Sequence, residues 1–328
     1  LEFSKKQDVK KERSFEELQK DMQIITSLQS TFRKKFRNSK KIWIKGALKY
    51  LSLVISDKYR EYYTNYGKTF FKVIRTEGGF PLKTGKREKF IDINLLYESK
   101  FEEKFIYFPL QLEPERSTLI PATFYTNQLD VITNIAKSIP IDFQLLVKEH
   151  PMQKIKGWRE ISFYKSIMEL PNVKLIHPSI PNDEMLKKCS LAITIAGTTG
   201  LEAALYKKPC IIFADTNYSY LPSVYRLRSL EDLPNAIRES LKKEVKLSDV
   251  NDFINLLDRN SFPFDIFGFN SKVLERFHTG GFMISNEISM KSLDSFLEED
   301  RESYEMLAEE HIKKINQYKK LEKIIDSK

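Results

Sequence analysis

The sequence has few of the residues that build disulfide frameworks or metal clusters. Its 328 residues include two cysteines and four histidines, too few for either kind of site. Cys189 and Cys210 both lie in apolar runs, so we interpret each as a buried, reduced thiol. This cysteine usage is typical of a cytoplasmic protein.

Long hydrophobic runs are absent as well. No segment reaches the roughly 18 consecutive apolar residues that a membrane span needs. The start, Leu1–Lys6, has neither a Met nor the apolar core of a signal peptide, and we interpret the chain as beginning within a longer protein. A composition of 41% hydrophobic and 30% charged residues is ordinary for a globular protein with room for two domains.

Three common sequence signatures are missing. The chain contains no Asp-x-Asp, no Walker A sequence and no GxGxxG. Their absence argues against metal-dependent sugar transferases, NTPases and dinucleotide enzymes. The sequence therefore predicts a site that uses neither a metal nor a cofactor.

Basic residues exceed acidic ones, with 54 Lys and Arg against 45 Asp and Glu and a net charge of +9. This excess suits acidic ligands, phosphate-rich substrates or anionic lipid surfaces. The lysines are scattered, and no zinc-finger, basic-zipper or RNP signature is present. We therefore expect no nucleic-acid partner.

The chain divides into three predicted regions. Residues 1–103 are expected to be mainly helical, beginning at a capping box of Ser14 and Glu17, with an irregular loop at residues 78–87. Residues 104–245 have an α/β pattern, and residues 246–328 are expected to be helical again.

The central region contains short apolar segments that end in polar or glycine residues. They are Phe105–Gln111, Phe143–Val147, Val173–Ile176, Leu191–Ile195 and Pro209–Phe213. Segments of this kind, rich in β-branched and aromatic residues, predict a Rossmann-like parallel sheet buried on both faces. Ligands of such sheets gather at the carboxyl ends of the strands.

Lys148 and His150 follow the second of these segments. A cationic Lys and an imidazole at a strand end can neutralise and hydrogen-bond a phosphate leaving group. The alternative is a surface Lys beside a structural His. Gln111 and Glu115, which follow the first segment, are expected to line the same cleft, and the loop at residues 177–183 either contacts a nucleobase or is a plain connection.

A glycine-rich turn, Gly197-Thr198-Thr199-Gly200, joins a predicted strand to an Ala/Leu-rich helix. Small residues allow the backbone to approach a phosphate, and free N–H groups with the helix dipole attract an anion. Glu202, in the first helical turn, can reach ribose hydroxyls. The alternatives are a tight turn with a Thr N-cap and an ordinary helix-start charge.

The order FPLQ, KEHP, GTTGLEAALYKKPCIIF resembles the capsule polysaccharide biosynthesis family, which contains bacterial Kdo transferases of the GT-B fold. The resemblance covers about residues 104–225. It implies that Lys148 and His150 contact the donor phosphate and Glu202 the ribose, with Gln111 and Glu149 also in the donor site. Glu115 stands where the family usually has Asp. Only about 100 mostly helical residues precede this region, whereas a GT-B enzyme has a Rossmann-like lobe there.

The resemblance implies an inverting, metal-independent glycosyltransferase, or its donor-binding half, that acts on a surface polysaccharide or glycolipid. The donor would be a CMP- or UDP-linked sugar, such as Kdo from CMP-Kdo. Two alternatives stay open. One is a nucleotide-sugar 2-epimerase or polyol-phosphate transferase of the same fold, and the other is a non-catalytic scaffold of a glycan-assembly complex.

A basic segment at residues 32–49 interleaves aromatic and positively charged side chains. Its basic residues are Arg33, Lys34, Lys35, Arg37, Lys40, Lys41, Lys45 and Lys49. Such clusters bind anionic lipid surfaces, which predicts a peripheral position on the inner membrane face. The competing interpretation is an ordinary helix that packs Trp43, Tyr50 and Val54 inside.

Overall fold

The computed structural model describes residues 12–23, 70–97, 104–262, 264–277 and 288–326, together with Ile44, Leu48, Ser52 and Ile55. The chain forms two compact units, one of residues 1–23 and 69–256 and the other of residues 24–68 and 257–328. Among the described helices, none has both the length and the apolar character needed to cross a membrane. The domain boundaries expected after residues 103 and 245 stay predictions.

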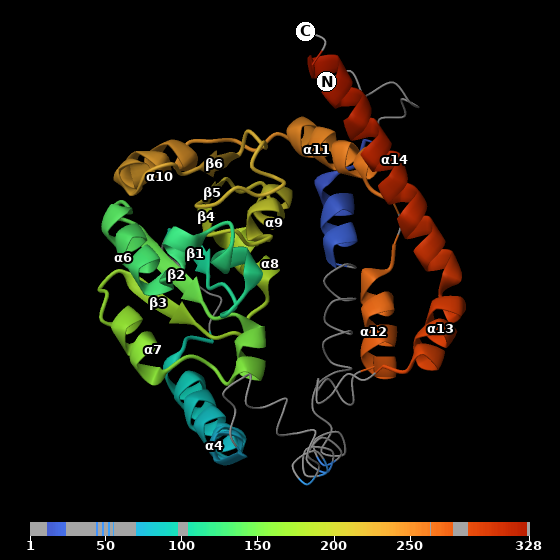
Figure 1. Ribbon diagram of the computed structural model, residues 1–328. Helices are drawn as coiled ribbons and strands as arrows, with labels where there is room; N and C mark the ends of the chain where they lie inside the picture. Colours follow the sequence, from blue (N-terminus) through green and yellow to red (C-terminus); the bar gives the residue numbers. More distant parts are fainter. Residues whose placement is uncertain are drawn as a thin grey trace. The chain divides into compact units, whose positions relative to one another are not determined.

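The first unit is built on a six-stranded sheet with strand order β3-β2-β1-β4-β5-β6 (Figure 1). The strands are β1 (Phe105–Pro109), β2 (Gln144–Lys148), β3 (Val173–Ile176), β4 (Leu191–Thr194), β5 (Cys210–Ile212) and β6 (Val224–Arg226). All neighbouring pairs are parallel. The predicted α/β class is therefore confirmed. Successive strands are added on one side of β1 up to β3 and on its other side from β4 onward. Doubly wound sheets bind ligands at this switch point between β1 and β4.

Helices cover both faces of the sheet. The chain steps outward from β1 to β3 and then returns to β4, so right-handed crossovers place the helices before and after the return on opposite faces. Figure 1 shows α6 and α7 on one side and α8 and α9 on the other. The elements that follow β1 are α5 (Arg116–Leu119), η1 (Thr123–Tyr125), α6 (Gln128–Ser138), η2 (Pro151–Lys156), α7 (Ile161–Met168), α8 (Asn182–Lys188), α9 (Thr199–Leu205), η3 (Leu230–Asp232), α10 (Leu233–Leu241) and α11 (Leu247–Asn260).

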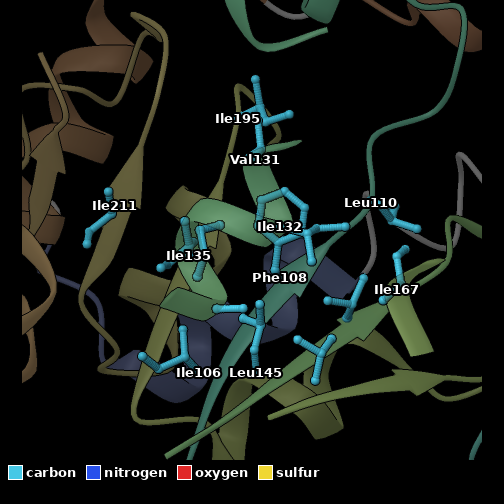
Figure 2. Packing of buried hydrophobic residues seen from close by; sticks show 14 of the residues in the cluster. Ile106, Phe108, Leu110, Val131, Ile132, Ile135, Leu145, Ile167, Ile195 and Ile211 are labelled. Carbon is cyan, nitrogen blue, oxygen red and sulfur yellow. The ribbon is translucent and has the colours of Figure 1, made fainter. Parts of the chain in front are cut away.

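The core lies where the middle strands meet α6. Ile106, Phe108 and Leu145 of the sheet and Ile132 and Ile135 of the helix are all fully buried (Figure 2). Burying a side chain of this size stabilises a fold by about 1.5–3 kcal/mol. This packing holds the strand ends, and the polar loops that follow them, in fixed positions.

Two local predictions are confirmed. The Ser14 backbone N–H donates to Glu17 Oε2 at 2.7 Å and the Glu17 N–H donates to Ser14 Oγ at 3.2 Å, which is a capping box. Cys189 and Cys210 are buried free thiols, and burial raises the pKa of Cys189 to about 12.

The prediction of a loop at residues 78–87 is wrong, because this segment lies within helix α4 (Phe70–Asn94). Gly78, Gly79 and Pro81 disfavour a helix by composition. Tertiary contacts offset that cost: Ile91 is fully buried, and Arg87 Nη1 donates to the Gly157 carbonyl at 2.9 Å. Such contacts cannot be read from local sequence.

The second unit contains helices α12 (Ile266–Phe277), α13 (Met290–Glu299) and α14 (Arg301–Asp326). Phe269, Phe277, Phe296 and Tyr304 pack together as an aromatic cluster. Of the basic segment at residues 32–49, only Ile44 and Leu48 are described, and both are exposed. The remainder of that segment lies outside the described residues.

Candidate functional site

The carboxyl ends of β1 and β4 meet at the point where the strand order reverses. Gln111, just beyond β1, donates from Nε2 to Thr194 Oγ1 at 3.0 Å, and the same hydroxyl accepts from the Gly197 N–H at 3.2 Å. A Cβ on Gly197 would lie 2.9 Å from Gln111 Nε2. A side chain at residue 197 would therefore have to displace the Gln111 amide or the Thr194 hydroxyl.

Lys148 ends β2 at the same edge, where its carbonyl accepts from the Leu110 N–H at 2.9 Å. It is only 5% exposed, and no described residue forms a hydrogen bond or ion pair with its ammonium group. Burial lowers the pKa of Lys148 to about 8, although the negative charge of Glu202 opposes that shift. Because burial disfavours the charged form of Lys148, an anion beside it would be stabilising.

His150 is held at the start of η2 by its own ring. The imidazole Nδ1 accepts from the Met152 N–H at 3.1 Å, and the residue N-caps the 3-10 turn that begins at Pro151. A nitrogen that accepts from a backbone N–H carries no proton, so the neutral ring bears its proton on Nε2. The Met152 N–H therefore fixes the orientation of the imidazole ring.

Glu149, expected in the donor site, is instead completely buried. Its Oε1 accepts from the His150 N–H at 2.6 Å, and its Oε2 accepts from Arg159 Nε at 2.9 Å and from the Tyr164 hydroxyl at 2.7 Å. Burial raises the pKa of Glu149, and Arg159 opposes that rise. Because the carboxylate is completely buried as well as hydrogen-bonded, we infer that Glu149 positions the His150 loop.

Glu202 lies in α9 within a chain of hydrogen bonds. Thr198 Oγ1 donates to its Oε1 at 2.8 Å and Asn182 Nδ2 to its Oε2 at 2.5 Å. The Tyr107 hydroxyl in turn donates to Asn182 Oδ1 at 2.5 Å. These contacts hold the carboxylate in one orientation at the half-buried start of the helix.

The turn before α9 is packed by protein side chains. The Tyr218 hydroxyl donates to the Gly197 carbonyl, and a Cβ on Gly200 would lie 2.5 Å from Tyr218 Cε2. Thr198 is exposed and Thr199 is buried. The two glycines thus have packing reasons of their own, in addition to any ligand that approaches the turn.

Glu115 lies further out, on the loop after β1. It is exposed, precedes α5, and its Oε2 accepts from Ser117 Oγ at 2.9 Å. The structure therefore gathers Gln111, Lys148 and the 197–200 turn at one sheet edge, with Glu115 on a neighbouring loop.

Sequence reasoning missed the side chains that support this edge. They are Tyr107, Gln128, Arg159, Asn182, Thr194 and Tyr218. Gln128, for example, accepts from the Gln111 N–H at 2.7 Å and donates to the Gln111 carbonyl at 3.1 Å. Only Thr194 had a usable signal, since it ends a predicted strand; the others act across long sequence separations.

The sequence matches the family described as "Capsule polysaccharide biosynthesis protein" over residues 27–245, which is more than half of the chain. Capsule polysaccharide modification protein LipB of Neisseria meningitidis, in one serogroup A and one serogroup B strain, is 26% identical over 138 residues. That match covers 40% of this chain and 33% of the relative. The chain spans about a third of the length of the curated relatives it matches.

Two solved structures show a similar arrangement. UDP-GlcNAc 2-epimerase from Methanocaldococcus jannaschii has a TM-score of 0.35 and 17% identity, over 52% of this chain and 49% of that one. KpsC from Thermosulfurimonas dismutans, a beta Kdo 2,7 transferase, has a TM-score of 0.33 and 12% identity, over 54% of this chain and 63% of that one.

Proposed function

We propose, because the chain belongs to the family of capsule polysaccharide biosynthesis proteins, that it is a glycosyltransferase or the donor-binding half of one. The donor would be a nucleotide-linked sugar and the acceptor a capsule polysaccharide or glycolipid. The reaction would be inverting and metal-independent, on a GT-B scaffold. CMP-Kdo is the first donor to test, because the motifs resemble those of Kdo transferases.

The observation that carries this proposal is Lys148. The Lys148 side chain is only 5% exposed, and it lies at the strand ends where doubly wound sheets bind ligands. Its ammonium group has no hydrogen-bond or ion-pair partner among the described residues. The 197–200 turn before α9 flanks the same edge, although the Gly197 N–H already donates to Thr194 Oγ1. A donor phosphate between Lys148, His150 and the 197–200 turn would neutralise the ammonium group, and Glu202 would accept from the ribose hydroxyls.

The chemistry follows from this placement. A carboxylate, for which Glu115 is our candidate, takes the proton of an acceptor hydroxyl. The hydroxyl oxygen then forms a bond to the anomeric carbon while the bond from that carbon to the phosphate oxygen breaks, so the configuration inverts. Lys148 and the His150 Nε2–H stabilise the charge that develops on the leaving phosphate, and removing one such donor typically costs about 100- to 1000-fold in rate.

Calorimetric titration of CMP, UDP and GDP into the chain tests the donor site. We expect one nucleotide to bind clearly more tightly than the others. If none binds at millimolar concentration, the donor-site proposal fails. Product that forms only when an acceptor glycan is present would separate a transferase from an epimerase, and nucleotide binding without turnover on any acceptor would indicate a scaffold.

Lys148→Met separates binding from folding. We expect nucleotide binding to be strongly weakened while the melting temperature at pH 7 stays the same or rises. The folded-state pKa of about 8 lies below the ordinary value of 10.5, so the charged form of Lys148 costs stability at pH 7. Lys174→Met, at an exposed position on the adjacent strand β3, is the matched control and should leave binding unchanged. A variant that unfolds, or one that still binds nucleotide normally, would contradict this assignment.

A further inference from the structure

A pocket of about 520 Å³ opens between the loops that follow β1 and β2. Pro114, Leu119 and Phe163 contribute apolar surface, and Glu113, Arg159 and Glu160 contribute charged groups. Its volume lies within the roughly 300–1,000 Å³ of small-molecule sites. None of its lining residues belongs to the donor site described above.

Arg159 is the best-defined polar group of this pocket. It is 6% exposed and carries five N–H donors. One donates from Nε to Glu149, one from Nη1 to Glu113, and one from Nη2 to the Gln111 carbonyl. Each guanidinium nitrogen thus has one acceptor, and the group also lies over the Phe163 ring, 5.0 Å from its centroid. Each Nη carries a second N–H group, which can donate to a ligand that supplies oxygen acceptors.

The local charge selects the class of ligand. Glu113 and Glu149 both form ion pairs with Arg159, so two carboxylates already face one guanidinium. Glu160 pairs with Arg87, and Lys156 donates to the Pro114 carbonyl. Three cations therefore balance three carboxylates here, so no charge is left over for an ionic ligand. A neutral hydroxyl can accept from Arg159 and donate to the carboxylate of Glu113 or Glu160. The apolar side chains of Leu119 and Phe163 suit the C–H faces of a sugar ring.

We propose that this pocket binds an uncharged sugar unit of the acceptor glycan. The acceptor role rests on the proposed function, whereas recognition of a neutral sugar rests on the pocket itself. Arg159 contacts the Gln111 carbonyl and Glu149, whose Oε1 holds the His150 N–H. The same guanidinium therefore joins the sugar pocket to the two loops that would hold the donor.

Saturation-transfer NMR on the whole chain tests the pocket without any transfer reaction. The probes are the methyl β-glycosides of glucose, galactose and N-acetylglucosamine, with methyl β-glucuronide as the anionic comparison. We expect at least one neutral glycoside to bind with a Kd on the order of 1 mM, near −4 kcal/mol, and the glucuronide to bind more weakly.

Leu119→Trp, at a half-exposed wall position, should fill the pocket and weaken binding about tenfold or more. Ile141→Trp, a fully exposed position before β2, is the matched control and should change nothing.

Three results would overturn the pocket proposal. They are no binding of any neutral glycoside, equal binding by the wild type and Leu119→Trp, and displacement of the glycoside by CMP or UDP, which would make the pocket part of the donor site. Glycoside binding by a chain that binds no nucleotide would instead reject the glycosyltransferase proposal and leave the sugar pocket standing.

Discussion

Lys148 shows how the surroundings of one side chain create its chemistry. Its pKa is lowered to about 8 by burial, and the carboxylates of Glu202, Asp183 and Glu184 limit that fall. A phosphate placed beside it would add negative charge and raise the pKa again. Ligand binding and protonation of this residue are therefore linked.

This linkage predicts a pH dependence of nucleotide binding. If Lys148 holds the donor phosphate as proposed, it does so in its charged form, below pH 8. Above pH 8 it loses its proton, so affinity should fall by up to about tenfold per pH unit. Calorimetry between pH 7 and 9.5 measures this slope. Residual binding by Lys148→Met should be flat over the same interval, and a wild-type affinity that does not change above pH 8 would show that Lys148 does not contact the phosphate.

Glu202 is predicted to recognise the ribose. Glu202→Ala should weaken binding of CMP or UDP by about tenfold or more, since hydrogen bonds to a charged group contribute roughly 1.5–3 kcal/mol. Binding of the 2′,3′-dideoxy nucleotide should be unaffected, because it lacks the hydroxyls. Glu184→Ala is the control, since Glu184 also acts on the charge of Lys148. An equal loss for both nucleotides in Glu202→Ala would indicate a general charge effect.

At the scale of elements, the turn that connects β4 to α9 is tightly packed. The strand end supplies Thr194, the turn supplies Gly197, and the Tyr218 ring packs where a side chain of Gly200 would be. The short helix therefore begins at a position set by its neighbours, since Thr198 makes no side-chain cap bond. Substitutions in this turn should act through packing.

Gly200→Ala tests that packing. The new methyl group would lie 2.5 Å from Tyr218 Cε2, and overpacking of this kind costs about 1–3 kcal/mol of unfolding free energy. Gly79→Ala is the contrasting control, because nothing lies within 4 Å of its Cβ position in α4; it should stabilise the chain by about 0.5–1 kcal/mol. Urea denaturation measures both, and a neutral Gly200→Ala would mean that Tyr218 moves aside freely.

At the scale of the whole molecule, the sheet unit contains both the proposed donor edge and the proposed sugar pocket. The whole chain carries a net charge of +9, which favours binding to anionic ligands and surfaces. A lipid-linked acceptor would bring the protein to a membrane surface.

Vesicle co-sedimentation tests that location. We expect the chain to bind anionic but not neutral vesicles, because each Lys or Arg near an anionic surface contributes on the order of 1 kcal/mol. Added salt and Lys/Arg-to-Gln changes at residues 33–41 should weaken binding. Equal recovery in the supernatant with both lipid types would leave residues 32–49 as an ordinary structural segment.

Local pattern alone determined several features of this protein. The five apolar segments became strands because period and composition act over a few residues, and Ser14 with Glu17 formed its cap because both partners lie within one helical turn. Lys148, Gln111 and Glu202 could be proposed as site residues because strand ends and helix starts are local signals, and their roles stay predictions. Only tertiary structure decided that Glu149 turns inward to Arg159 and Tyr164, that residues 78–87 are helical, and that a pocket opens beside Arg159. The physical reason is that burial and ion pairing depend on residues distant in sequence, and no local pattern specifies them.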